Sequence, residues 1–221
     1  MSALAQRKEW GIRSAFFLVA LASIMILLLI VTFLFAEGLP IFKHVSVKDF
    51  LFGEYWYPTA DPPDFGIFPL ITASIAVTLI SALLSIPLGE MTAIYLAEIA
   101  TPRVREWVKP VVELLAALPS VVIGFFGMVV VAPVLQETLD LATGLNLFNA
   151  AVMLAFMSIP TITSISEDAI YSVPVELKEA SLALGANHWQ TISRVIVPAS
   201  LSGISTAVIL GMSRAIGETM V

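Results

Sequence analysis

The chain has 221 residues, of which 58% are hydrophobic and 13% charged, and its mean hydropathy is +0.95. This composition excludes a soluble globular domain and indicates an all-α polytopic membrane protein. The net charge of −6 argues against nucleic-acid binding, and the absence of cysteine excludes a disulfide framework, a thiolate metal site and a cysteine nucleophile.

The N-terminal region contains the first predicted transmembrane helix, residues 14–36. Its apolar run is longer than the hydrophobic part of a signal peptide and no Ala-x-Ala site follows it, so we expect a retained anchor. Residues 1–13 carry three basic residues, which predicts a cytoplasmic N-terminus: Arg7, Lys8 and Arg13. Residues 37–66 are polar, hold five acids together with Pro58, Pro62 and Pro63, and are expected to form an external loop.

Residues 67–221 form the predicted membrane core. Its spans lie at about 67–97, 110–136, 148–170 and 199–221. Over the whole chain, segments assigned to the inside hold eight basic residues and segments assigned to the outside hold two, which predicts a multi-pass protein of the cytoplasmic (inner) membrane, in contact with the lipid bilayer. The fifth span ends abruptly without flanking polar residues, so we expect a chain truncated after this helix, lacking at least one returning helix.

Pro119 and Ser120 lie midway along the span at 110–136. A proline removes a backbone hydrogen bond and kinks a helix, which frees a carbonyl that can face a translocation pathway. The alternative is a kink that serves packing only. Both residues are candidates for the pathway.

Glu167 and Asp168 lie near the end of the span at 148–170. Adjacent residues on a helix point roughly 100° apart, so the two carboxylates do not suit a paired-carboxylate enzyme. We expect them to be interfacial charges that brace the loop that follows.

The polar segment 171–198 predicts a short cytoplasmic helix–turn–helix. Small residues at 180, 181 and 183 permit close helix approach, and Gly185 permits a sharp turn at a helix C-terminus. Pro198 suits the start of the next helix, where its missing N–H costs nothing. The segment resembles the EAA loop of ABC importer permeases, with Ser181 in place of the second alanine and with Gly185, Val195, Val197 and Pro198 at the expected offsets.

This resemblance implies a loop that couples the membrane subunit to a cytoplasmic ATPase. Six residues are the candidates for that coupling: Glu179, Ala180, Ser181, Gly185, His188 and Pro198. The alternative is an ordinary cytoplasmic loop that is rich in alanine.

Arg214 and Glu218 stand four residues apart in the last apolar span, so on one continuous helix they share a face and can pair. A lone arginine near the centre of a membrane helix costs about 2.5–3.5 kcal/mol, and pairing lowers that cost. We assign the pair, with the adjacent Thr219, to gating or to transient coordination of an anion. The alternative is a neutralised pair that only locks two helices together.

Three segments together resemble the phosphate-specific ABC importer permeases, and within them the PstC-type subunit: Leu118–Gly127, Val173–Pro198 and Arg214–Thr219. The resemblance implies the type I importer permease (MetI-like) helical bundle and import of inorganic phosphate. It also implies a second, PstA-type permease, a PstB-type ATPase dimer and an external PstS-type phosphate-binding protein as partners. The chain has no nucleotide motif of its own, so ATP and Mg would be bound by the ATPase.

Two other classes of function compete with this prediction. A proton-coupled secondary anion transporter would use Arg214 and Glu218 as a relay, but the inverted repeats typical of that class are not evident. An intramembrane hydrolase would need a nucleophile and a base, and neither histidine lies within a predicted span. The histidines also lack a second ligand at metal spacing, so we expect no metal site.

Overall fold

The computed structural model describes the backbone of residues 3–218, and the chain divides into two compact units, residues 1–69 and 70–221. The first unit contains the long helix α1 (Ala3–Gly38), the 3-10 helix η1 (Leu39–Lys43) and the short helix α2 (Val47–Phe52). It ends with an antiparallel hairpin of two short strands, β1 (Trp56–Tyr57) and β2 (Asp64–Phe65). The predicted external loop therefore has regular structure that its polar composition did not indicate.

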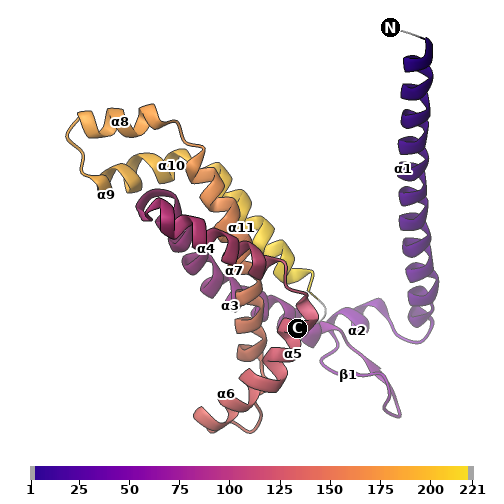
Figure 1. Cartoon of the computed structure of the whole chain (residues 1–221). Coiled ribbons are helices and arrows are strands. Elements are labelled where there is room, and N and C mark those ends of the chain that lie inside the picture. Colours follow the sequence, from indigo (N-terminus) through magenta and orange to yellow (C-terminus); the bar gives the residue numbers. More distant parts are fainter. Residues whose placement is uncertain (1–2, 219–221) are drawn as a thin grey trace. The chain divides into compact units, whose positions relative to one another are not determined.

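The second unit is helical, and Figure 1 shows its helices side by side. It includes three π-helical turns, in which the backbone hydrogen bond spans five residues. In chain order the elements are α3 (Phe68–Ile94), η2 (π, Tyr95–Ile99), α4 (Pro102–Ala116), α5 (Ser120–Phe126), η3 (π, Gly127–Val131), α6 (Ala132–Thr138), α7 (Leu147–Tyr171), α8 (Val175–Ala183), α9 (His188–Thr191), η4 (π, Ile192–Ile196), α10 (Val197–Ala199) and α11 (Leu201–Ile216).

Helix α7 is the centre of the second unit, and α4 and α11 pack against it. Ile162 of α7 lies between glycines of two neighbouring helices: a Cβ on Gly89 of α3 would lie 2.8 Å from it, and one on Gly211 of α11 2.5 Å. Hydroxyl groups add interhelical hydrogen bonds, from Thr163 to the Gly89 carbonyl and from Ser158 to the Gly211 carbonyl, each 3.2 Å. Close approach at small residues combined with such hydrogen bonds is how helices associate in membranes, where burial of apolar surface does not favour association.

The structure confirms a polytopic helical protein. Among residues 3–218, four helical stretches are long and apolar enough to cross a membrane: Trp10–Lys43, Phe68–Ile99, Ser120–Thr138 and Leu147–Tyr171. The pair His188–Ala199 and Leu201–Ile216, bent by 69°, provides a fifth if it is counted as one span.

Two predicted spans differ from the structure. The span at 110–136 is not one kinked helix, because the chain leaves helical geometry between Ala116 and Ser120, and Pro119 is the extended N-cap residue of α5. Of the described residues in the span predicted at 199–221, α11 comprises Leu201 to Ile216, Ala199 belongs to α10, and Gly217 and Glu218 lie beyond the helix. The break at 117–119 lies in a largely apolar run, so hydropathy did not reveal it.

Candidate functional site

The segment between α7 and α11 forms a helical hairpin of α8 and α9, which we call the coupling hairpin (Figure 1). Its turn is at Gly185, whose φ of +86° is a conformation that favours glycine. The Gly185 N–H donates to the Leu182 carbonyl at 2.9 Å, and the Ala186 N–H donates to the Ser181 carbonyl at 3.2 Å. These two bonds form a Schellman motif. The predicted glycine turn is therefore confirmed.

A polar contact joins the two arms of the coupling hairpin. Ser181 is buried, and its hydroxyl lies 3.0 Å from the Thr191 hydroxyl of α9. Asn187 and Gln190 form a reciprocal capping box that starts α9. Ser181 thus lies inside the hairpin, where a small residue is needed for close approach, rather than on the exposed face.

The exposed face of the coupling hairpin includes most of the predicted coupling residues: Glu179, Ala180, Gly185 and His188. Leu184 is 89% exposed and Trp189 is 67% exposed beside them. Two large apolar side chains on a polar hairpin indicate a contact surface. Leu184 was not among the predicted residues, because a leucine in an apolar sequence carries no distinguishing signal.

Pro198 does not begin the long helix that follows. It lies in the three-residue helix α10, at the end of the helical run His188–Ala199, and α11 starts only after the 69° bend at Ser200. Pro198 is exposed, next to the bend.

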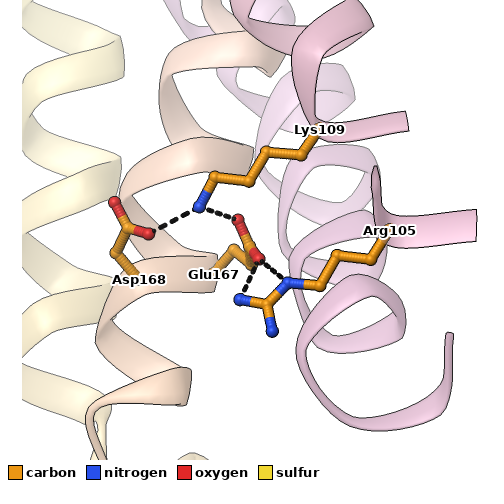
Figure 2. Close-up of polar contacts among 4 residues, drawn as sticks. All are labelled: Arg105, Lys109, Glu167 and Asp168. Carbon is orange, nitrogen blue, oxygen red and sulfur yellow. Dashed lines mark hydrogen bonds and ion pairs between the residues drawn. The ribbon is translucent and has the colours of Figure 1, made fainter. Parts of the chain in front are cut away.

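A buried ion-pair cluster joins α4 to the last turns of α7, just before the coupling hairpin (Figure 2). Glu167 is only 1% exposed; its Oε1 lies 2.7 Å from Arg105 Nη2 and 2.8 Å from Arg105 Nε. Its Oε2 lies 2.8 Å from Lys109 Nζ, which also lies 2.8 Å from Oδ1 of the exposed Asp168. The guanidinium of Arg105 further covers the ring of Tyr171 at 4.2 Å.

The Lys109 ammonium is stabilised in its charged form by this cluster. Burial alone would lower the pKa of Lys109, but hydrogen bonds to Asp168 and Glu167 and the charges of both carboxylates outweigh it, so the pKa lies above its ordinary value. Because the pKa of Lys109 is higher in the folded protein than in the unfolded chain, where it is about 10.4, the charged lysine stabilises the fold fully below that pH. This stabilisation is lost as the pH rises through the pKa of the folded protein. The ion pairs of Lys109 with Glu167 and Asp168 are therefore intact at neutral pH.

We expect Glu167→Ala to destabilise the protein by about 3–5 kcal/mol, because it leaves Arg105 and Lys109 beside a buried site without their shared carboxylate. Asp168→Ala removes an exposed partner of the same lysine and should cost at most about 1 kcal/mol. Denaturant or thermal unfolding of the purified protein in detergent compares the two. Equal effects would contradict the assignment of the stability to the buried carboxylate.

Arg214 of α11 reaches two neighbouring helices at once. Its Nη1 donates to Thr161 Oγ1 of α7 at 3.3 Å, and its Nη2 donates to the backbone carbonyl of Ala116 at 3.2 Å. Ala116 is the last residue of α4, where carbonyls lack intrahelical partners and the helix dipole is negative, so a cation is favoured there. Thr161 lies near the middle of α7, so this site lies at mid-span.

The structure thus brings together two regions that the sequence suggested separately. Pro119 and Ser120 lie three and four residues after Ala116, at the break between α4 and α5. The carbonyl that Arg214 binds is that of Ala116, at the end of α4, and not that of Leu115, which stands four residues before Pro119 and accepts from the Leu118 N–H. The predicted roles of Pro119 and Ser120 in a pathway stay predictions.

The helical spacing assumed for Arg214 and Glu218 is wrong. Helix α11 ends at Ile216, and Glu218 lies beyond it, with its N–H donating to the Ala215 carbonyl at 3.4 Å. The two residues therefore do not share one helix face by the i, i+4 rule. Thr219 lies outside the described residues.

Within the described part of the chain, no group of three or more His, Asp or Glu side chains is arranged to hold a metal ion.

Comparison with known proteins identifies relatives of this chain. The family model described as "Binding-protein-dependent transport system inner membrane component" matches residues 85–221. The probable ABC transporter permease protein YqgH of Bacillus subtilis (strain 168) is 44% identical over 213 residues, which cover 95% of this chain and 69% of that protein. The phosphate transport system permease protein PstC of Mesorhizobium japonicum is 34% identical over 190 residues, covering 77% of this chain and 58% of that protein.

Among solved structures, a chain of the MetNI methionine ABC transporter in inward-facing conformations matches with a TM-score of 0.59 and 22% identity, covering 72% of this chain and 74% of that chain. This likeness confirms the MetI-like helical bundle. The chain spans less than two thirds of the length of the PstC relatives of Mesorhizobium japonicum and Haemophilus influenzae.

Proposed function

Because the chain belongs to the family of binding-protein-dependent transport system inner membrane components, we propose that it is the permease subunit of an ATP-driven phosphate importer. Membership makes it a membrane subunit of an ABC importer, which is a transport component and not an enzyme. The proposal adds the substrate, the partners and the roles of named residues.

The phosphate assignment is supported by the Arg214 site. An ABC importer needs a passage at mid-span, and irregular backbone at membrane depth is tolerated only where it is buried in protein or lines a water-filled cavity. The break at 117–119 is such backbone, and Arg214 lies against it. A guanidinium is the side chain best suited to bind an oxyanion bidentately. Several relatives are phosphate transport system permeases, which favours phosphate among the oxyanions.

Transient rather than tight binding is expected at this site. Arg214 is already engaged by Thr161 and by the Ala116 carbonyl, and a transported ion must also leave. High affinity would therefore reside in an external binding protein of the PstS type. Arg214 and Glu218, with Thr219, would control passage between this subunit and a homologous PstA-type permease.

The coupling hairpin would dock on a cytoplasmic ATPase dimer of the PstB type, which would bind ATP and Mg. Leu184 and Trp189 provide exposed apolar contacts on the hairpin, and the Gly185 turn fixes the angle between its arms. The basic residues Arg105, Lys109 and Lys178 all lie near this end of the second unit, which supports a cytoplasmic location for the hairpin. For the N-terminus, the support for a cytoplasmic location is the group Arg7, Lys8 and Arg13 in the sequence.

Uptake of radiolabelled phosphate into proteoliposomes tests the proposal. With the chain co-expressed with its ATPase, second permease and binding protein, we expect uptake that needs ATP inside the vesicle and loaded binding protein outside. Sulfate should not compete. Uptake driven by a proton gradient without ATP would contradict the proposal and favour a secondary transporter.

A further inference from the structure

An ion pair connects the coupling hairpin to a different transmembrane helix from the one that leads into it. Lys178 of α8 pairs with Glu98, which lies in the π-helical turn η2 at the end of α3. The two residues are 80 positions apart in the sequence. Helix α8 follows α7 directly in the chain, so this pair joins it laterally to α3.

The Glu98 carboxylate depends on this contact. The side chain of Glu98 is 9% exposed and that of Lys178 is 31% exposed. Within the described residues, Lys178 Nζ is the only hydrogen-bond or ion-pair partner of that carboxylate. The pair borders a cavity of about 370 Å³ whose other lining includes Ile170, Val173 and Ile196. A carboxylate beside apolar walls is costly unless it is paired, so the pair resists separation.

The two arms of the coupling hairpin are attached by different means. The arm after the Gly185 turn continues into η4, whose Ile192 and Ile196 are buried in an apolar cluster with Ala93 of α3 and Ile170 of α7. Helix α8 has only one buried residue, Ser181, and that residue bonds to the other arm. Among the hydrogen bonds and ion pairs of its described side chains, only Lys178–Glu98 connects α8 to a transmembrane helix.

The local backbone at Glu98 suits a contact that moves. In η2 the Ala100 N–H donates to the Tyr95 carbonyl at 2.7 Å, a hydrogen bond that spans five residues. Such π-helical turns insert an extra residue into a helix, can shift its register and occur often at functional sites. A force on Glu98 therefore acts where the α3 span departs from α-helical geometry.

We infer that Glu98 and Lys178 are positioning residues that transmit movement of α8 to helix α3, so that ATP-driven displacement of the coupling hairpin moves the transmembrane helices. This inference rests on the proposed ABC importer function. It does not require that the substrate be phosphate. Neither residue is expected to touch the substrate or ATP.

The test measures transport and ATP hydrolysis together in proteoliposomes that contain the complete complex. Glu98→Gln and Lys178→Met each remove one charge at similar size, and the double variant Glu98→Lys with Lys178→Glu exchanges the charges. Asp168→Asn is the matched control, because it removes an ion pair of Lys109 at the same end of the second unit but on the exposed surface. All variants are first checked for copurification with the ATPase.

We expect both single variants to copurify and hydrolyse ATP at the basal rate, with substrate transported per ATP reduced on the order of tenfold. The charge exchange should restore most of that ratio, and Asp168→Asn should match the wild type. Normal coupling in both single variants overturns the inference, as does failure of the charge exchange to restore coupling. A loss seen only in variants that no longer copurify also overturns it, since the pair would then be structural.

The wild-type measurement separates this inference from the proposed function. Absence of ATP-dependent uptake by the wild-type complex counts against the importer proposal itself. Normal wild-type uptake with unaffected single variants counts against the Glu98–Lys178 inference alone.

Discussion

Arg214→Ala is expected to reduce uptake on the order of a hundredfold while the subunit still assembles with its partners. The guanidinium bridges Thr161 of α7 and the Ala116 carbonyl at the end of α4 in a partly buried site, and a hydrogen bond made by a charged group contributes about 1.5–3 kcal/mol. The loss should appear in uptake by proteoliposomes. Copurification of the ATPase provides the measure of assembly.

Thr161→Val is the matched control for this variant. It removes the bond to Nη1 at nearly constant volume but leaves the positive charge and the bond to Ala116 in place. If the charge of Arg214 serves passage of an anion, Thr161→Val should retain most of the uptake that Arg214→Ala loses. Equal losses in the two variants would mean that the helix contact, rather than the charge, is what uptake requires.

Replacing both Arg214 and Glu218 by apolar residues of similar volume distinguishes passage from a structural lock. A buried charged group that only joins helices can often be replaced by apolar residues without loss of stability. If the two residues control passage, the double variant should assemble normally and still fail to transport. Normal uptake by the assembled double variant would contradict a role in passage.

Gly185→Val is expected to uncouple ATP hydrolysis from transport while the subunit remains in the membrane. The φ of +86° resists a β-branched residue, and holding one there costs about 1–3 kcal/mol. A Cβ at this position would meet no atom within 4 Å, so the effect arises from the backbone and not from a clash within the chain. The strained turn should open, which changes the angle between α8 and α9.

Gly185→Asn is the control, because asparagine adds a side chain but tolerates positive φ. We expect it to couple nearly as well as the wild type. The measurement is the ratio of transported substrate to hydrolysed ATP in proteoliposomes. If both variants uncouple equally, bulk at the ATPase contact is responsible and the role assigned to the glycine turn is wrong.

Hydropathy and short motifs were sufficient to predict much of the fold. The apolar runs predicted a polytopic helical protein, because a membrane helix has to satisfy its backbone internally and present apolar side chains to lipid. The spacing from Glu179 through Gly185 to Pro198 predicted the hairpin, because a positive φ at a helix end depends on local residue type. These features depend on residues close together in the chain.

Breaks within apolar runs were not predictable in the same way. The chain leaves helical geometry between Ala116 and Ser120, within a largely apolar run, and α11 ends at Ile216, two residues before Glu218. The spacing of Arg214 and Glu218 therefore suggested a shared helix face that the structure does not have. Whether an apolar run is one helix or two depends on which neighbouring groups form hydrogen bonds with the freed backbone atoms, as Arg214 does by donating to the Ala116 carbonyl.

The sequence by itself determined the class of protein and the glycine turn of the coupling hairpin. Only the tertiary structure decided the partners of the charged residues: Ala116 and Thr161 for Arg214, at separations of 98 and 53 residues, and Glu98 for Lys178 at 80 residues. No helical period relates positions so far apart. A charge within a membrane protein takes whichever partner the packing of helices brings within reach, because leaving it unpaired in a medium of low dielectric constant costs more than any local preference supplies.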